Sequence, residues 1–242
     1  MTDVEKKKLL GKAEKFFRET IAIQHIENLK KLKKLDQFDV NPFLVTYLAY
    51  FLTGNGDPKS LAKALVYPRI LGTSITTSFG SSFQRKFISE VLGAVGTIIT
   101  GTDIEFVDQI DHRKKYCQLK SGPNNINFDD VETIKNKFRG IRNLAKQNNK
   151  KLSVDDLIVG VLYGTKDSLS VFYHKIAEDY PVLVGEDFWY HLTGDKSFYT
   201  ELGERFGKVA RETDAKDLLE EVINDLAKDI EENFVRKELG KK

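Results

Sequence analysis

The uncharged run Leu157–Tyr163, with the sequence LIVGVLY, constrains the fold of this chain more than any other feature. A continuous apolar run of strand length is typical of a central strand that is covered on both faces. The pattern directly before it predicts a helix over residues 129–147, because apolar side chains recur there at helical spacing. These side chains are Val131, Ile134, Phe138, Ile141 and Ala145. A sheet flanked by helices is therefore the expected core.

The order of the other elements extends this core into a mixed α/β architecture. Helices are predicted over 3–34, 42–52, 58–67 and 81–95. A strand hairpin is predicted over 103–110 and 114–120, and further strands over 169–176 and 182–184. A last helix is predicted over 214–239. This order indicates an α/β core with a helical addition. The helix over 42–52 is apolar nearly all round, so it is expected in a core or against a second subunit.

The composition is that of a globular protein, and it restricts the chemistry. The 242 residues are 40% hydrophobic and 31% charged, with a net charge of +2. This balance does not exclude nucleic-acid binding, which depends on a local basic surface. The single cysteine, Cys117, excludes an intrachain disulfide framework and suits a reducing cytoplasm. We see no signal peptide and no apolar run of the ~20 residues that span a bilayer, so a cytoplasmic protein without a membrane partner is expected.

The predicted hairpin carries the candidate catalytic residues. Side chains alternate between the two faces of a strand. Asp103 opens the first strand, and Gln118 and Lys120 share one face of the second strand. When the two strands fold back on each other, these three side chains can converge at one spot while the apolar set faces the core.

This group of polar residues matches the needs of a metal-dependent phosphodiesterase of the PD-(D/E)XK type. A hard cation such as Mg²⁺ prefers oxygen ligands. Asp103 offers a carboxylate, Gln118 an amide oxygen and Leu119 a backbone carbonyl. Lys120 is placed to orient or help deprotonate the attacking water and to offset charge on the phosphorane. The alternative is an ordinary cross-strand ion pair between Asp103 and Lys120 on an exposed hairpin.

Three stretches of the chain resemble type II restriction endonucleases of the PD-(D/E)XK superfamily. The stretch GTDIEFVD…YCQLKSGPNNIN is similar to their active-site segment. LGTSITTSFGSSFQRKF upstream and GEDFWYHLTGD downstream resemble the same enzymes, and together the matched stretches span residues 69–195. The resemblance is closest to the family that cuts RGGNCCY-like sites. It implies an α/β fold with a restriction-endonuclease-like mixed β-sheet flanked by helices, and with additional N- and C-terminal helices.

The resemblance also implies a role for each polar residue of the hairpin. Asp103 becomes the metal-binding aspartate and Lys120 the catalytic lysine, with Mg²⁺ as the cofactor and Mn²⁺ as a substitute. Gln118 stands where the superfamily has a second acidic residue. Because glutamine is neutral, less of the metal's charge is neutralised. A replacement carboxylate is expected from Glu90 on the preceding helix or from Glu105 on the strand of Asp103. Glu90 is preferred, because helix carboxylates take this part in some members.

Contacts with DNA are expected from the loop after the hairpin and from the next helix. The loop residues are Ser121, Asn124, Asn125 and Asn127. Their side chains can bond base edges or phosphates, although asparagines are also ordinary turn residues. Arg139 and Arg142 on the outer face of helix 129–147 form a candidate phosphate-binding face, with a solvated helix face as the alternative.

The function that the resemblance implies is a type II restriction endonuclease, which hydrolyses both strands of duplex DNA at a short specific site and depends on Mg²⁺. Such enzymes read near-palindromic sites as homodimers, and a cognate DNA methyltransferase is expected in the same system. Three rival hypotheses stay open. They are a structure-specific or repair nuclease on the same fold, a DNA-binding protein whose site has decayed at Gln118, and an unrelated α/β protein.

Three regions are expected along the chain. Residues 1–68 form a helical region with dimerisation as its candidate role. Residues 69–195 form the PD-(D/E)XK catalytic core. Residues 196–242 form a C-terminal helical region that packs on the core or on the partner subunit.

Overall fold

The computed structural model describes residues 1–82, 86–88, 95–96 and 101–237. The chain forms two compact units, and each of them combines two stretches of sequence. The first unit contains residues 1–16 and 80–207, and the second contains residues 17–79 and 208–242. No helix in the described part of the chain is long and apolar enough to cross a membrane. The roles expected for the regions 1–68, 69–195 and 196–242 stay predictions.

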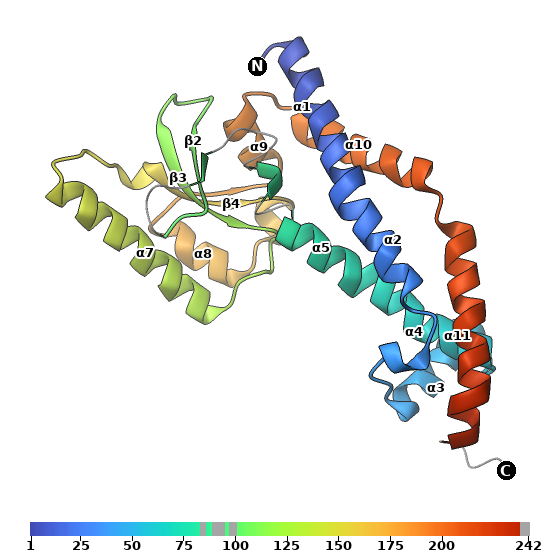
Figure 1. Ribbon diagram of the computed structural model, residues 1–242. Coiled ribbons are helices and arrows are strands. Elements are labelled where there is room, and N and C mark those ends of the chain that lie inside the picture. The colour runs from blue at the N-terminus through green and yellow to red at the C-terminus, as the bar shows by residue number, and fades with distance from the viewer. Residues whose placement is uncertain (83–85, 89–94, 97–100, 238–242) are drawn as a thin grey trace. The chain divides into compact units, whose positions relative to one another are not determined.

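A mixed sheet forms the centre of the first unit. Its five strands, counted over the described residues, are ordered β1-β2-β3-β4-β5. They are β1 (Val95–Gly96), β2 (Ile104–Val107), β3 (Lys114–Lys120), β4 (Leu157–Val161) and β5 (Val182–Val184). The pairs β1–β2 and β2–β3 are antiparallel, whereas β3–β4 and β4–β5 are parallel. The expected mixed α/β fold, with helices at both ends of the chain, is confirmed (Figure 1).

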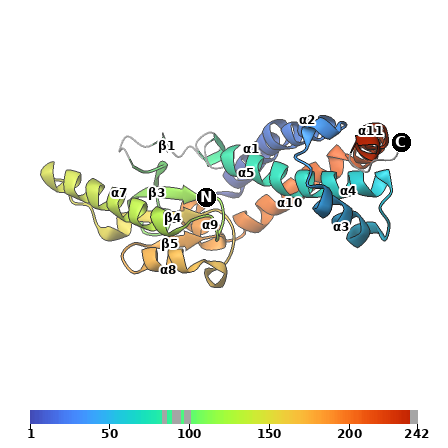
Figure 2. The ribbon, with the colours of Figure 1, turned by 90° about the horizontal axis from the view of Figure 1, so that it is seen from below.

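β4 is buried over its whole length, as its apolar sequence predicts. Helices α7 (Phe128–Gln147) and α8 (Val171–Ala177) pack against one face of the sheet through apolar side chains, and Figure 1 and Figure 2 both show α7 alongside the strands. Helix α9 (Glu186–Thr193) lies on the other face. There Gly160 allows a close approach, because a Cβ atom on it would lie 2.4 Å from Cε2 of Phe188.

The segment 169–176 contains a helix, so the strand predicted there is wrong. α8 begins at Val171, after a 3-10 turn over Lys166–Ser168. Tyr173 and Ile176 lie three positions apart, and both are fully buried in the cluster that includes α7. This spacing places two side chains on the same face of a helix. Short apolar runs are ambiguous between helix and strand, and packing decides in favour of the helix here.

The remaining elements are helical. The helix predicted over 3–34 is present as α1 (Asp3–Phe16), a π-helical turn η1 (Phe17–Ala22) and α2 (Ile23–Lys30). It is followed by η2 (Leu35–Gln37), α3 (Pro42–Thr53), α4 (Pro58–Pro68), η3 (Arg69–Ser74) and α5 (Ile75–Ser82). The later ones are η5 (Val154–Asp156), α10 (Phe198–Thr213) and α11 (Lys216–Lys237). Most of the helix predicted over 81–95 lies outside the described residues.

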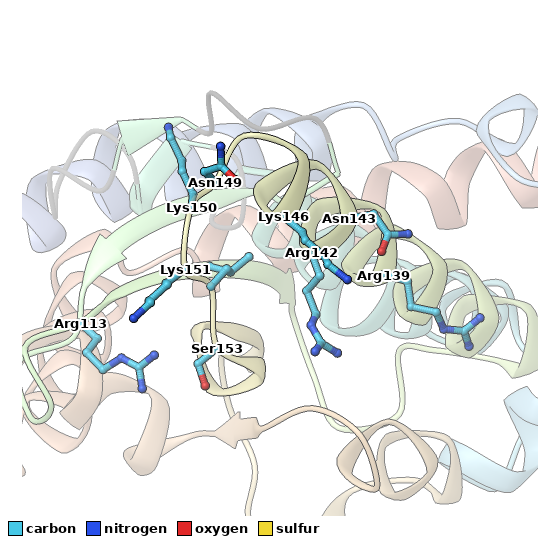
Figure 3. Close-up of a pocket in the computed structure, with 10 residues that line it drawn as sticks. Arg113, Arg139, Arg142, Asn143, Lys146, Asn149, Lys150, Lys151 and Ser153 are labelled. Atoms are coloured by element: carbon cyan, nitrogen blue, oxygen red, sulfur yellow. The ribbon is translucent and has the colours of Figure 1, made fainter.

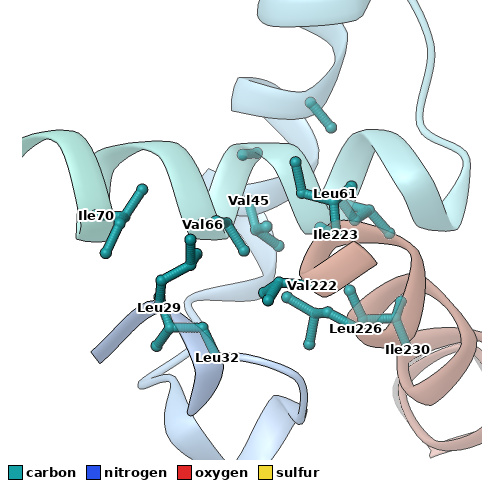
Figure 4. Packing of buried hydrophobic residues seen from close by; sticks show 13 residues of the cluster. Leu29, Leu32, Val45, Leu61, Val66, Ile70, Val222, Ile223, Leu226 and Ile230 are labelled. Carbon is teal, nitrogen blue, oxygen red and sulfur yellow. The ribbon is translucent and has the colours of Figure 1, made fainter. Parts of the chain in front are cut away.

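The second unit has its own apolar core, which α4 and α11 share with neighbouring helices (Figure 4). Leu61 and Val66 of α4 and Leu226 and Ile230 of α11 are among its buried residues. The apolar helix α3 contributes only Val45 and Ala49 to the described burial. Its large side chains are exposed, with Phe43 at 86% and Phe51 at 78%. The prediction that its own chain covers this helix on nearly all sides is therefore wrong, and burial against a second subunit stays a prediction.

Candidate active site

Asp103 lies beside Gln118 and Leu119 near the carboxyl end of β3. The backbone N–H of Asp103 donates to the carbonyl of Cys117 at 2.9 Å, which extends the β2–β3 ladder by one residue. Oδ2 of Asp103 accepts a hydrogen bond from the backbone N–H of Leu119 at 2.7 Å. The same oxygen accepts from Nε2 of Gln118. The structure therefore brings Asp103 and Gln118 together, as the strand alternation predicts.

Oxygen atoms suited to a hard cation gather at this position. Oε1 of Gln118 is buried and has no hydrogen-bond partner among the described residues. A strand residue presents its N–H and C=O groups to the same neighbouring strand. The carbonyl of Leu119 therefore faces the side on which its N–H meets Asp103. A carboxylate, an amide oxygen and a carbonyl are the ligand types that Mg²⁺ prefers. This donor set carries one formal negative charge and fits a divalent cation.

One of the two candidates for a second carboxylate is already engaged in an ion pair. Glu105 is buried, and its Oε2 lies 2.5 Å from Nζ of Lys114, so an ion pair holds it. The preferred candidate, Glu90, lies outside the described residues. No group of three or more histidine, cysteine, aspartate and glutamate residues in the described part of the chain could hold a metal ion. The source of a second carboxylate stays a prediction.

Lys120 contacts a carboxylate that the sequence analysis missed. Its Nζ atom lies 3.2 Å from Oδ1 of Asp130, the third residue of α7. Oδ2 of Asp130 accepts from the backbone N–H of Asn127 at 3.0 Å. The hydrogen bond from Asn127, and after it the one from Lys120, holds the pKa of Asp130 below its ordinary value. Among the described residues no ion pair joins Lys120 to Asp103, so the simple cross-strand pair is absent.

The loop after β3 is braced by its own polar side chains. Oδ1 of Asn127 accepts from the backbone N–H of Asp130 at 3.0 Å, which completes a capping box at the start of α7. Nδ2 of Asn125 donates to Oγ of Ser121. Asn124, Asn125 and Asn127 are all exposed. Contact of these four loop residues with DNA stays a prediction.

Arg139 and Arg142 line an open hollow of about 860 Å³ at the far end of α7 (Figure 3). We call it the basic hollow, after its cationic lining residues Arg113, Arg139, Arg142, Lys146, Lys150 and Lys151. Asn149, with a φ of 53°, reverses the chain after α7. The backbone N–H of Lys150 then donates to the carbonyl of Ala145 at 2.8 Å. This helix end brings the cations of the following segment beside those of α7.

Comparison with known proteins gives one family for this chain. The sequence model of the family described as Type II restriction endonuclease EcoO109I matches residues 11–214. This range is well over half of the chain, and it includes the β2–β3 hairpin and α7. No curated protein matches the sequence.

Proposed function

Because the chain belongs to the family of the type II restriction endonuclease EcoO109I, we propose that it hydrolyses both strands of duplex DNA at a short specific site. The observation that carries this proposal is the gathering of oxygen atoms from Asp103, Gln118 and Leu119 at the carboxyl end of β3. Lys120 follows directly on the same strand. This arrangement on the hairpin of a mixed sheet supports an assignment to the PD-(D/E)XK superfamily.

Each residue of the site has a distinct task in the proposed reaction. The carboxylate of Asp103, Oε1 of Gln118 and the carbonyl of Leu119 would hold Mg²⁺, with Mn²⁺ as a substitute. The bound metal would polarise the phosphodiester group and make a bound water more acidic. Lys120 orients the attacking water and offsets the negative charge that develops at the phosphorus. Asp130 fixes the ammonium group of Lys120 through the ion pair between them.

The neutral side chain of Gln118 leaves the site short of one negative charge. We propose that Glu90 supplies it, because the carboxylate of Glu105 is engaged by Lys114. Gln118 itself is suited to its position, since it donates to Asp103 and still has an amide oxygen without a partner in the described part of the chain.

DNA binding is proposed for the loop after β3 and for α7. Ser121 and the loop asparagines would contact bases and phosphates near the cut position, and Arg139 and Arg142 on α7 would contact phosphates of the adjoining duplex. The resemblance to enzymes that cut RGGNCCY-like sites supports a near-palindromic target of that type. A symmetric target suits a homodimer, which presents the same reading surface to each half-site.

The proposed dimer interface is the apolar surface of α3. Phe43, Tyr47 and Phe51 follow one another at intervals of four residues, so they lie along one face of the helix. All three are exposed, and the rings of Tyr47 and Phe51 stack with centroids 6.1 Å apart. Contiguous exposed apolar surface of this kind marks an interaction site. A second copy of the chain, packed on the same helix, would cover it.

Digestion of a plasmid of known sequence with Mg²⁺, followed by sequencing of the ends, tests the proposed function. A restriction endonuclease gives a fixed set of fragments whose ends share one sequence. Cutting only of nicked, mismatched or branched DNA would instead show a repair or structure-specific nuclease. Binding without cutting, with Mg²⁺ or Mn²⁺ present, would show that the site has decayed at Gln118. We propose that the enzyme acts in the cytoplasm, where a cognate DNA methyltransferase protects the host's copies of the site.

A further inference from the structure

The basic hollow lies far from the proposed catalytic group. Arg113 precedes β3, and Lys151 lies shortly before β4, so both mark the amino ends of this parallel strand pair. Asp103, Gln118 and Lys120 mark the opposite end of β3. Because a strand rises about 3.3 Å per residue, the length of β3 separates the two places by roughly 20 Å. The hollow therefore cannot touch the phosphate that is cut.

The charge of the basic hollow is largely uncompensated. Within the described residues, Arg113 pairs with Asp156 at 2.7 Å, and Arg139 donates to the neutral side chain of Asn136. Arg142, Lys146, Lys150 and Lys151 are exposed and make no ion pair there. No acidic residue is found among the described residues that line the hollow. An excess of positive charge on one surface, with no internal partner, is the footprint of an anion-binding site.

Helix electrostatics explain only a small part of this cluster. Cations near a helix C-terminus are favourable because of the helix dipole, but the effect is limited to the last turn. On α7 that accounts for Lys146. Arg142 and Lys146 stand four positions apart, where like charges destabilise a helix. Lys150 and Lys151 belong to the loop after the helix. The stability of α7 therefore does not account for the cluster as a whole.

The spacing of the cations suits a chain of phosphates better than a single small anion. Arg139, Arg142 and Lys146 span eight residues of α7, and the seven steps between the first and the last rise about 10 Å along the helix axis. The phosphates of one DNA strand follow one another at about 3.4 Å along the duplex axis. Several phosphates thus fit along the stripe. A compact anion would need donors that converge on one point.

From these observations we infer that the basic hollow binds the phosphate backbone of duplex DNA that flanks the cut site. The inference rests on the proposed function, because it takes the substrate to be duplex DNA. The inference takes the duplex to run along the direction of β3, in which a separation of roughly 20 Å corresponds to about six base pairs. Lys146, Lys150, Lys151 and Arg113 thus form a second set of backbone contacts, which adds affinity without reading sequence.

Salt dependence of binding tests whether the hollow contacts phosphates. The variant Lys146→Gln/Lys151→Gln is titrated with a random-sequence duplex of about 30 base pairs, without divalent metal, over a range of KCl concentrations. A plot of the logarithm of the association constant against the logarithm of the salt concentration has a negative slope. Losing two phosphate contacts should make this slope shallower by about 1.8. The control Lys7→Gln/Lys8→Gln removes the same charge from exposed positions on α1. An unchanged slope in the first variant, or an equal loss in the control, would overturn the inference.

Duplex length tests where the contacts lie. On the site found by plasmid digestion, a duplex of about 10 base pairs ends before the hollow, whereas one of about 30 base pairs passes it. Wild type should prefer the longer duplex more strongly than Lys146→Gln/Lys151→Gln does. Equal length dependence in the two proteins contradicts the inference. Inorganic phosphate that competes with DNA more strongly than chloride does at equal ionic strength would show a small-anion site. This result would also overturn the inference. Because the salt titration measures binding to random-sequence DNA without divalent metal, its failure is separate from a failure to cut DNA.

Discussion

The ammonium group of Lys120 and the carboxylate of Asp130 lie 3.2 Å apart, across the loop that joins β3 to α7. Both side chains are partly exposed, at 20% and 32%. Ion pairs in such positions typically contribute no more than about 1 kcal/mol to stability. The orientation of the Lys120 side chain is the more important consequence, because the ion pair holds the lysine beside the candidate metal site. Asp130 is therefore a positioning residue in the proposed reaction.

Replacing Asp130 should impair cutting more than folding. We expect Asp130→Asn to lower kcat by about 10- to 100-fold with little change in KM, since a small misplacement of a reacting group costs this much. Steady-state cleavage rates over a range of plasmid concentrations measure both constants. The control is Asp129→Asn, which removes the same charge one residue earlier in the same helical turn. Equal kcat values for wild type and Asp130→Asn would contradict the positioning role.

The acid stability of the protein should also depend on Asp130. Hydrogen bonds from Asn127 and Lys120 lower the pKa of this carboxyl group. A carboxyl group with a lowered folded-state pKa adds stability above its ordinary pKa of about 3.9, and this stability is lost as the pH falls through the lowered pKa. Urea unfolding should show a difference between wild type and Asp130→Asn at about pH 6 that shrinks towards pH 3. A difference that does not change with pH would argue against this contribution.

Gln118→Glu should make the stability of the protein depend on a divalent cation. In wild type the amide of Gln118 donates to Asp103. A glutamate would place two carboxylates together, which disfavours the charged forms of both. We expect the free energy of unfolding to fall by about 1–3 kcal/mol in EDTA. In Mg²⁺ it should partly recover, because a ligand that binds only the folded state stabilises it.

Urea unfolding in EDTA and in Mg²⁺ measures this effect. The control Gln118→Ala also removes the hydrogen bond but adds no charge, so it should gain no extra stabilisation from Mg²⁺. If Mg²⁺ stabilises wild type and Gln118→Glu equally, Gln118 does not face the metal position.

The exposed face of α3 should control the oligomeric state. Phe51 is 78% exposed, so a lysine there costs the isolated chain little, but it would place a charge in the proposed interface. We expect Phe51→Lys to raise the dimer dissociation constant at least about tenfold, or about 1.4 kcal/mol, as measured by sedimentation velocity. Thr46→Lys puts the same charge at another exposed position of α3 and serves as the control. Dimerisation that survives Phe51→Lys would place the interface elsewhere.

Local patterns in the sequence are sufficient to predict that Asp103 and Gln118 of the candidate site lie together. Strand alternation puts Asp103 and Gln118 on facing positions of a hairpin, and the structure pairs them. The apolar run LIVGV predicts a buried strand, and β4 is buried throughout. These features depend on side-chain direction within one or two adjacent strands. They are therefore visible without knowledge of the tertiary fold.

The features that sequence reasoning missed depend on contacts between elements. The spacing Asn127-x-x-Asp130 indicates a helix start, but it does not show that Lys120 reaches the same carboxylate. Only the path of the loop after β3 brings the two together. The error at 169–176 has the same origin, because the burial of Tyr173 against α7 decides between helix and strand. The basic hollow likewise combines residues from three segments of the chain.

Cleavage and binding by Asp103→Ala and Lys120→Ala test the central claim most directly. Each variant is incubated with plasmid and Mg²⁺, and its binding to the same DNA is measured in parallel, with Lys12→Ala on the exposed surface of α1 as the control. We predict that both variants fold and bind DNA but do not cut it, while the control cuts normally. Normal cutting by either Asp103→Ala or Lys120→Ala would contradict the assignment of the active site to this hairpin.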